Sequence, residues 1–376
     1  MKTFIKKEPV LTAALILAVI SAFFVKPDIK YLDYIDFRTL GILFSLMAVM
    51  AGFKELGVFK FIALEILNHA KNLWHTLLVL VMLCFFFSML ITNDVALITF
   101  VPVTLEVLNL LGSKQKSRLL IPIVTMQTIA ANLGSMLTPI GNPQNLYLYG
   151  KADMELAAFI KLMLPYSLVA FILLLVWCFI KGRFSKNSNT DFTLGSFDTP
   201  SLSANKKALT IYTVLFILCM FTVARLLPWQ FLCVIVLITL IFTDKKVISK
   251  VDYSLLMTFI AFFIFIGNMG RVESFYKMLA DAITGSETNI AIISSQIISN
   301  VPAALLLSGF TDRFPLLIIG TNLGGLGTLI ASMASLISFK YVARENDIST
   351  AKYLGYFTVW NVIFLIILLI VNAILI

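Results

Sequence analysis

Long apolar runs separated by short charged loops make up most of this chain. A helix needs about 20 mostly apolar residues to cross the hydrocarbon of a bilayer, and several runs reach that length. The short alternating segments of a membrane β-barrel are not seen in the sequence. The pattern therefore predicts an all-α polytopic membrane protein. The first run, residues 10–25, has no small-residue cleavage site after it and is expected to stay as the first helix.

The composition agrees with a chain that lies in lipid. Hydrophobic residues make up 60% of the sequence and charged residues 13%, whereas about a quarter of the residues of a soluble protein are charged. The four cysteines lie inside apolar runs at spacings unlike those of metal ligands, so we expect them to be small buried side chains. They are Cys84, Cys178, Cys219 and Cys233.

The positive charges mark one side of the membrane. The net charge is +9, and lysine and arginine cluster in alternate loops, whereas the other loops mix lysine with aspartate and glutamate. By the positive-inside rule the basic loops and the amino terminus are cytoplasmic. The basic excess therefore reflects topology in a cell membrane, and no nucleic-acid partner is expected.

Residues 73–112 are apolar but have basic residues at both ends, so this segment must enter the membrane and return to the same side. At its midpoint lie Thr92, Asn93 and Asp94, which lipid would not accept. We expect a re-entrant hairpin with its tip buried in protein. Two full spans joined by a tight outer turn are the alternative.

The second half of the chain repeats features of the first half in the same order. Correspondences of this kind indicate inverted repeats in a membrane protein. The matched segments are 35–37 with 251–253, 91–96 with 298–303, and 132–140 with 322–330, and a short amphipathic segment precedes each hairpin.

These correspondences predict the domain organisation. Residues 1–185 form the first inverted repeat, with a hairpin at about 73–112 and a broken helix at about 119–150. A cytoplasmic linker covers 186–207, the only long polar stretch. Residues 208–376 hold a connecting helix and the second repeat, with a hairpin at about 289–311 and a broken helix at about 314–341. Nine spans and two hairpins result.

Glycine and proline interrupt the matched segments 119–150 and 314–341, which otherwise are apolar enough to be helices. An unwound backbone in hydrocarbon leaves unpaired N–H and C=O groups, so it persists only where it lines a cavity. Two broken helices and two hairpin tips are therefore expected to enclose one central polar site. The interrupting residues are Gly134, Pro139, Gly141 and Pro143 in the first segment and Gly324, Gly325 and Gly327 in the second.

At these positions the chain resembles the ion transporter superfamily, which includes divalent anion/sodium symporters, arsenite permeases, citrate transporters and sodium/proton antiporters. The motifs TNDVA, NLGSMLTPIGNPQN, SNVPA and TNLGGLGTLIAS carry the resemblance, which runs from about Asp36 to the end of the chain. It implies a scaffold and a transport domain that moves as an elevator. Relatives are often dimers, so a homodimer is also an expectation.

The resemblance also implies which residues form the site. The symporters bind substrate carboxylate at Ser-Asn-Thr tips and hold sodium between each tip and its unwound helix. No cofactor is expected beyond sodium ions at these same positions. The implied substrate-binding residues are Thr92, Asn93, Asn142, Ser299, Asn300, Thr138 and Thr328. The implied ion-binding or coupling residues are Asp94, Asn93, Gly134, Asn132, Asn300, Gly324 and Asn322.

The third tip position departs from the symporter pattern, because it is Asp94 in one tip and Val301 in the other. A charged carboxylate at mid-bilayer costs about 2.5–3.5 kcal/mol even on lenient scales, so Asp94 should be paired, protonated or cation-bound. As a coupling group it would favour proton or sodium coupling. The structural alternative is that Asp94 caps the second limb of the hairpin.

The sequence thus predicts a secondary active transporter of a small anion, either a carboxylate or an inorganic oxyanion, coupled to sodium or protons. No phosphate-binding lysine loop indicates ATP as the driver. A sodium/proton antiporter or an arsenite-type metalloid efflux permease is the alternative within transport. An intramembrane hydrolase is the alternative from another class, but Asp94 has no acidic partner in the matched tip, so no enzyme activity is expected.

Overall fold

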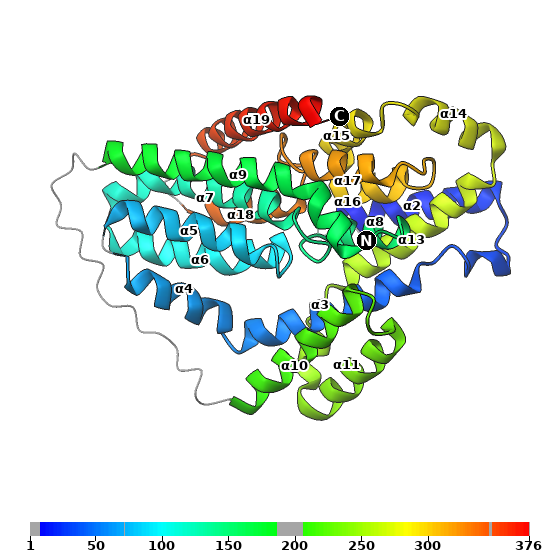
Figure 1. Cartoon of the computed structure of the whole chain (residues 1–376), viewed down its shortest axis with the longest axis horizontal. Helices are drawn as coiled ribbons and strands as arrows, with labels where there is room; N and C mark the ends of the chain where they lie inside the picture. Colours follow the sequence, from blue (N-terminus) through cyan, green and yellow to red (C-terminus); the bar gives the residue numbers. More distant parts are fainter. Residues whose placement is uncertain (1–7, 71, 186–205, 346–347, 376) are drawn as a thin grey trace.

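The computed structural model describes residues 8–70, 72–185, 206–345 and 348–375, and the regular elements in these ranges are all helices (Figure 1). The first half contains α2 (Pro9–Phe24), η1 (Ile29–Tyr31), α3 (Phe37–Glu55), α4 (Val58–Asn68), α5 (Leu73–Phe87), α6 (Asn93–Leu110), α7 (Ser113–Ser135), α8 (Pro143–Lys151) and α9 (Leu156–Ser185). The second half contains α10 (Lys206–Val223), α11 (Trp229–Thr243), α12 (Lys245–Ile248), α13 (Tyr253–Gly270), α14 (Glu273–Ile283), α15 (Glu287–Ile298), α16 (Asn300–Leu307), α17 (Phe314–Leu323), α18 (Met333–Val342) and α19 (Thr350–Leu375). The all-α prediction is confirmed.

Six of the described helices are long and apolar enough to cross a membrane, namely α3, α6, α9, α10, α13 and α19. The outer face of α9 shows why: Leu168, Ile172, Val176 and Phe179 follow one another at helical spacing and are all exposed. An apolar stripe of this length would be unstable in water and is stable against lipid. Of the two helices of the first hairpin, α6 is long enough to cross a membrane and α5 is among the shorter apolar helices. Helix length therefore leaves open the choice between a re-entrant hairpin and two full spans.

Helices α3 and α13 begin in the same way. Asp36 caps α3 by accepting a hydrogen bond from the Thr39 backbone N–H at 2.9 Å, and Asp252 caps α13 by accepting one from Leu255 at 3.0 Å. An aspartate at this position satisfies a donor that the helix leaves free. The sequence correspondence between segments 35–37 and 251–253 thus marks two equivalent helix starts.

The order of elements after these two helices is also the same. Short helices α4 and α14 have 11 residues each, and each precedes a helical hairpin, α5/α6 or α15/α16. An interrupted helix follows each hairpin, α7 and α8 in the first half and α17 and α18 in the second, and then comes a long helix, α9 or α19. The interruptions fall at residues 136–142 and 324–332, inside the segments expected to break.

Some boundaries differ from those expected. Helix α7 begins at Ser113, earlier than residue 119, because Lys114, Lys116 and Arg118 favour helix and the long side chains of such residues can extend to the interface. Lys206 and Lys207 already belong to α10, and the expected linker otherwise falls on residues 186–205, which lie outside the described residues.

The second part of each interrupted helix, α8 or α18, packs against the other half of the chain. Hairpin α5/α6 packs against α7 of its own half, and α18 of the other half packs against α6 and α7. In the same way, hairpin α15/α16 packs against α17, and α8 of the first half packs against α16 and α17. Figure 1 shows α5, α6, α7 and α18 grouped at one end of the molecule and α8, α15, α16 and α17 toward the other. The two interruptions therefore meet between the two groups.

A further set of helices lies beside these groups. Helix α3 contacts α10, α11 and α13, and α13 packs along α2. Arg225, after α10, forms an ion pair with Asp153, after α8, and lies 5.2 Å from the ring centre of Tyr149. This contact joins the end of the first interrupted helix to the helices around α3.

Candidate functional site

Each hairpin tip is hydrogen-bonded to the interruption in its own half. The backbone N–H of Asn93 donates to the Gly141 carbonyl at 3.1 Å, and that of Asn300 donates to the Ala331 carbonyl at 3.0 Å. Both carbonyls belong to the residue just before the cap of a second half-helix. The two matched bonds place each tip against the start of α8 or α18.

Asparagine side chains connect the two halves across the centre. Asn93 Nδ2 donates to Asn132 Oδ1 at 2.9 Å, and Asn132 Nδ2 donates to the Gly325 carbonyl at 3.4 Å. On the other side, Asn322 Nδ2 donates to Asn145 Oδ1 at 2.7 Å. These asparagines are all buried. The structure therefore brings the predicted residues Asn93, Asn132 and Asn322 into one internal polar layer.

The second tip reaches the same layer through Gly325. A methyl group added at Gly325 would lie 3.1 Å from Asn300 Nδ2, so the amide of Asn300 occupies the space that this glycine leaves open. Asn142 lies on the first-half side, where its Nδ2 donates to Ser135 Oγ at 2.7 Å. Ser299 precedes Asn300 with a φ of +73°, a conformation that L-residues rarely adopt.

Helix ends give the layer its electrostatic character. Helices α6, α8, α16 and α18 begin here, and α5, α7, α15 and α17 end here. Free N–H groups at helix starts attract anions, and free carbonyls at helix ends attract cations. The hydrogen-bonded side chains of the layer are asparagine and serine, without lysine, arginine or histidine. The layer can thus hold an anion and a cation with uncharged groups.

Asp94 stands beside the layer, in the first turn of α6. Its backbone N–H donates to Asn93 Oδ1 at 2.9 Å, and its side chain is partly exposed. The cap of α6 is Thr92, whose hydroxyl accepts from the Val95 N–H, so the structural alternative in which Asp94 caps this helix is wrong. Within the described ranges its carboxylate takes part in none of the ion pairs.

Thr138 and Thr328 do not turn toward the asparagines. The Thr138 hydroxyl donates to the Met89 carbonyl at 2.5 Å, and the Thr328 hydroxyl donates to the Gln296 carbonyl at 3.2 Å. Both hydroxyls thus tie an unwound stretch to the last turn before its hairpin tip. Thr328 is also exposed. Their contact with a substrate stays a prediction.

Gly134 and Gly324 allow close helix packing. A methyl group at Gly134 would lie 2.0 Å from the Phe85 carbonyl oxygen, and one at Gly324 would lie 2.7 Å from Ser295 Oγ. Each glycine therefore lets the first half-helix approach its own hairpin. This packing alone requires glycine at both positions, while a role in ion binding stays a prediction.

Sequence reasoning missed several polar side chains of the site. Asn145 binds Asn322, Ser332 Oγ donates to Asn132 Oδ1 at 3.0 Å, and Gln144 is completely buried. Gln296 Nε2 donates to the carbonyls of Gly324 and Leu326, both at 2.9 Å. The motif alignment could have found Asn145 and Ser332, because the two interruptions match residue by residue beyond Thr138 and Thr328. No match between the two halves of the sequence points to Gln296.

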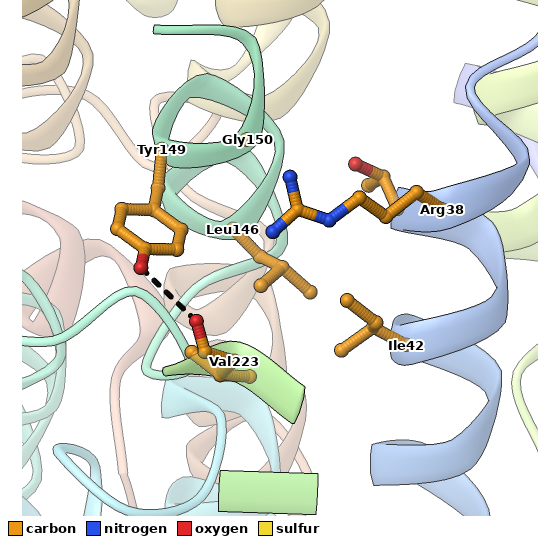
Figure 2. Close-up of a pocket in the computed structure, with 7 residues that line it drawn as sticks. Arg38, Ile42, Leu146, Tyr149, Gly150 and Val223 are labelled. Atoms are coloured by element: carbon orange, nitrogen blue, oxygen red, sulfur yellow. Dashed lines mark hydrogen bonds between the residues drawn. The ribbon is translucent and has the colours of Figure 1, made fainter. Parts of the chain in front are cut away.

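A cavity of about 340 Å³ lies farther along α8, between α3 and α13. Its lining includes Tyr147 and Lys151 of α8 together with Asp36 and Arg38. Figure 2 shows Arg38 extending from α3 toward Gly150 at the end of α8, next to the hydrogen bond from Tyr149 to the Val223 carbonyl. The cavity gives the end of α8 a polar opening beside α3.

Comparison with known proteins gives a consistent result. The family model described as "Citrate transporter" matches residues 3–313. An uncharacterized transporter of Methanocaldococcus jannaschii is 33% identical over 306 residues, 81% of each chain. The inner membrane protein YbiR of Escherichia coli is 30% identical over 312 residues, 81% of this chain and 80% of that protein.

A shorter match is to the P protein of Homo sapiens, 25% identical over 132 residues, which cover 35% of this chain and 15% of that protein. The family match covers both hairpins, the interrupted first helix and most of the polar layer described above. This chain is a multi-pass membrane protein that belongs to the citrate transporter family of the ion transporter superfamily.

Proposed function

We propose that this protein is a secondary active transporter of a small anion, a carboxylate or an inorganic oxyanion, and that sodium or protons drive it. The proposal rests on the buried polar layer in which two hairpin tips and two interrupted helices meet. Four helix starts favour an anion there, and four helix ends favour a cation beside it. The name of the family supports a carboxylate such as citrate as the first substrate to test.

The proposed mechanism is an elevator built from two inverted repeats. The repeated order of elements, the matched bonds of Asn93 and Asn300, and the exchange of α8 and α18 support the repeats. In this mechanism the hairpins and interrupted helices move as one unit past a scaffold that contains α3, α10, α11 and α13. The amino terminus is cytoplasmic in this arrangement, as the positions of the basic loops predict.

Asp94 is the proposed coupling group. It lies next to Asn93, at the start of α6, with a partly exposed carboxylate outside the described ion pairs. A carboxylate in such a place can take up a proton or a sodium ion and lose it again on the other side. The same property makes a sodium/proton antiporter the second candidate, because an antiporter needs Asp94 but no anion.

Reconstituted protein tests the proposal directly. Proteoliposomes are placed in a solution of radiolabelled citrate, phosphate or arsenite, and a sodium or pH gradient is imposed across their membrane. Protein-free liposomes are the control. We expect at least one anion to accumulate in a gradient-dependent way. Sodium flux at the same rate with no anion present would instead establish the antiporter, and accumulation of arsenite alone would establish a metalloid permease.

A further inference from the structure

The cavity between α3, α8 and α13 is lined by two cationic side chains, Arg38 of α3 and Lys151 of α8. Among the described residues, neither side chain has a partner in an ion pair or a hydrogen bond. Lys151 is exposed, so the cavity opens at the surface, and Arg38 is half-buried. A guanidinium has five N–H donors and an ammonium has three. The cavity therefore offers positively charged donors from two of its walls.

The carboxylates around this cavity leave both cations available. The two oxygens of Asp36 are bonded to Thr39, Oδ1 to its backbone N–H at 2.9 Å and Oδ2 to its hydroxyl at 2.5 Å. Asp36 and Asp312 attract Lys151 through their charge from beyond ion-pair distance. Asp33 lines the cavity from the exposed stretch before α3. Within the described ranges, the lining thus leaves two cations and one carboxylate, that of Asp33, without a partner.

Helix α8 leads from this cavity to the polar layer. It begins at the layer, where Asn142 is its cap, and it ends at Lys151 after 9 residues, which span about 13 Å at 1.5 Å per residue. Tyr147, halfway along α8, also lines the cavity. Its hydroxyl shares a hydrogen bond of 2.8 Å with Ser308, at the end of α16. The cavity therefore reaches halfway along the helix that starts at the layer.

The size and the charge of the cavity indicate the class of its ligand. Ligand pockets have volumes of about 300–1,000 Å³, and this cavity of about 340 Å³ is large enough for a small molecule. The planar fork of a guanidinium matches two oxygens of a carboxylate or a phosphate, and an ammonium adds a point charge. A small oxyanion can therefore bind Arg38 and Lys151 at the same time.

We propose that this cavity is an entry site for the cargo, in which Arg38 and Lys151 hold a small oxyanion before it passes along α8 to the polar layer. The inference rests on the proposed transport function. Arg38 belongs to the proposed scaffold and Lys151 to the proposed moving unit, so the two cations face one cavity only in this position of α8. The site therefore loads the transporter from one side of the membrane, which the predicted topology makes the outside.

Uptake kinetics test the two cations. In Arg38→Gln and Lys151→Gln we expect the KM of gradient-driven uptake to rise about tenfold, because a charged hydrogen bond to the anion is lost, while the maximal rate stays within about twofold. Arg38→Lys and Lys151→Arg keep the charge and should raise KM less. Asp33→Asn should lower KM about twofold to threefold, because it removes a carboxylate that repels the anion. Lys161→Gln, at an exposed site near the start of α9, is the matched control and should change neither quantity.

A cysteine at position 35 reports binding without transport. Ile35 lines the cavity and is uncharged, so Ile35→Cys leaves both cations in place. Its modification by a negatively charged thiosulfonate is followed in phosphatidylcholine vesicles at constant ionic strength, and wild-type protein with its 4 cysteines gives the background. We expect citrate or phosphate to slow this modification about threefold or more. The same anions should have no effect in Ile35→Cys/Arg38→Gln.

The outcomes separate an entry site from its alternatives. Slowing by phosphatidylglycerol in the vesicles, with no soluble anion present, would mean that a lipid head group fills the cavity, and the inference would be wrong. An unchanged KM in both glutamine variants, or modification that neither citrate nor phosphate slows, would also overturn it while the transport function stands. If the wild-type protein takes up no anion, the proposed function fails, and the entry role fails with it.

Discussion

Amide side chains replace the backbone hydrogen bonds that the interrupted helices lose. Gln296 donates to two carbonyls of the second interruption and accepts from the Thr328 N–H at 2.9 Å. In the first interruption Asn145 Nδ2 lies 3.4 Å from the carbonyls of Ser135 and Thr138. An amide can donate and accept at once without carrying charge, which suits an unwound backbone away from water.

The packing role of Gly134 gives a stability prediction. In Gly134→Ala the added methyl group would lie 2.0 Å from a backbone oxygen of α5, so the helices must separate. We expect the free energy of unfolding to fall by about 1–3 kcal/mol, seen as a lower melting temperature in detergent. Gly355→Ala, in α19 with no atom within 4 Å, is the control and should be neutral or slightly stabilising. Equal melting of both variants would contradict the packing role.

Asp94 gives a prediction about coupling. Asp94→Asn keeps the shape of the side chain but removes the charge, so gradient-driven uptake should fall about tenfold or more, whereas binding of the anion should persist. Uptake into proteoliposomes with and without the gradient measures this. Asp281→Asn, on the exposed face of α14, is the matched control. Unchanged gradient dependence in Asp94→Asn would assign coupling elsewhere.

At the scale of elements, the half-helices are held by their neighbours and not by their own length. Helices α8, α17 and α18 have 9, 10 and 10 residues, too few to be stable alone. Each packs against a hairpin, and the tip of each hairpin is fixed by a bond to the interruption. The hairpin and the interrupted helix are therefore one cooperative unit.

Gln296 tests this cooperativity. Gln296→Ala leaves the carbonyls of Gly324 and Leu326 and the N–H of Thr328 without their side-chain partner. Each of the two buried carbonyls left unpaired costs about 1–3 kcal/mol, so we expect a clear loss of thermal stability together with faster hydrogen exchange across residues 324–332. Gln230→Ala, at an exposed site in α11, should change neither measurement. Exchange confined to the substituted residue would argue against one unit.

At the scale of the whole molecule, the two hairpin groups meet the proposed scaffold where α8 packs against α3 and where α16 packs against α13. Asp153, after α8, pairs with Arg225, after α10. Gly150 of α8 faces Thr39 of α3, so that an added methyl group would lie 3.6 Å from the threonine hydroxyl. An elevator movement must slide α8 past α3. A covalent link at this place would therefore stop the cycle.

The link is made with a cysteine pair. In Thr39→Cys/Gly150→Cys, oxidation should abolish uptake into proteoliposomes and a reductant should restore it. The control pair is Thr128→Cys/Ser338→Cys, which joins α7 to α18. The hydroxyls of Thr128 and Ser338 lie 2.7 Å apart inside the proposed moving unit. A disulfide between these positions should therefore leave uptake intact. Transport that continues with the first pair fully oxidised would exclude sliding of α8 past α3.

The sequence by itself determined the class of fold and the residues that interrupt it. Apolar runs of membrane length fixed the helices, because lipid admits few other structures. Glycine and proline predicted a break within each of the segments 119–150 and 314–341, because these residues disfavour continuous helix, and the structure has the interruptions at 136–142 and 324–332. Repetition pointed to Asn93, Asn132, Asn300 and Asn322 as one group, since matched motifs occupy matched positions.

Only the tertiary structure decided which of these side chains have hydrogen-bond partners. The pairing of Asn322 with Asn145, the three bonds of Gln296 and the packing of α8 against the other half all join residues far apart in the chain. Local patterns carry no information on such contacts, because the same asparagine can face a carbonyl, another amide or an open site. The bond from Asn322 to Asn145 exists only once the two halves are packed together.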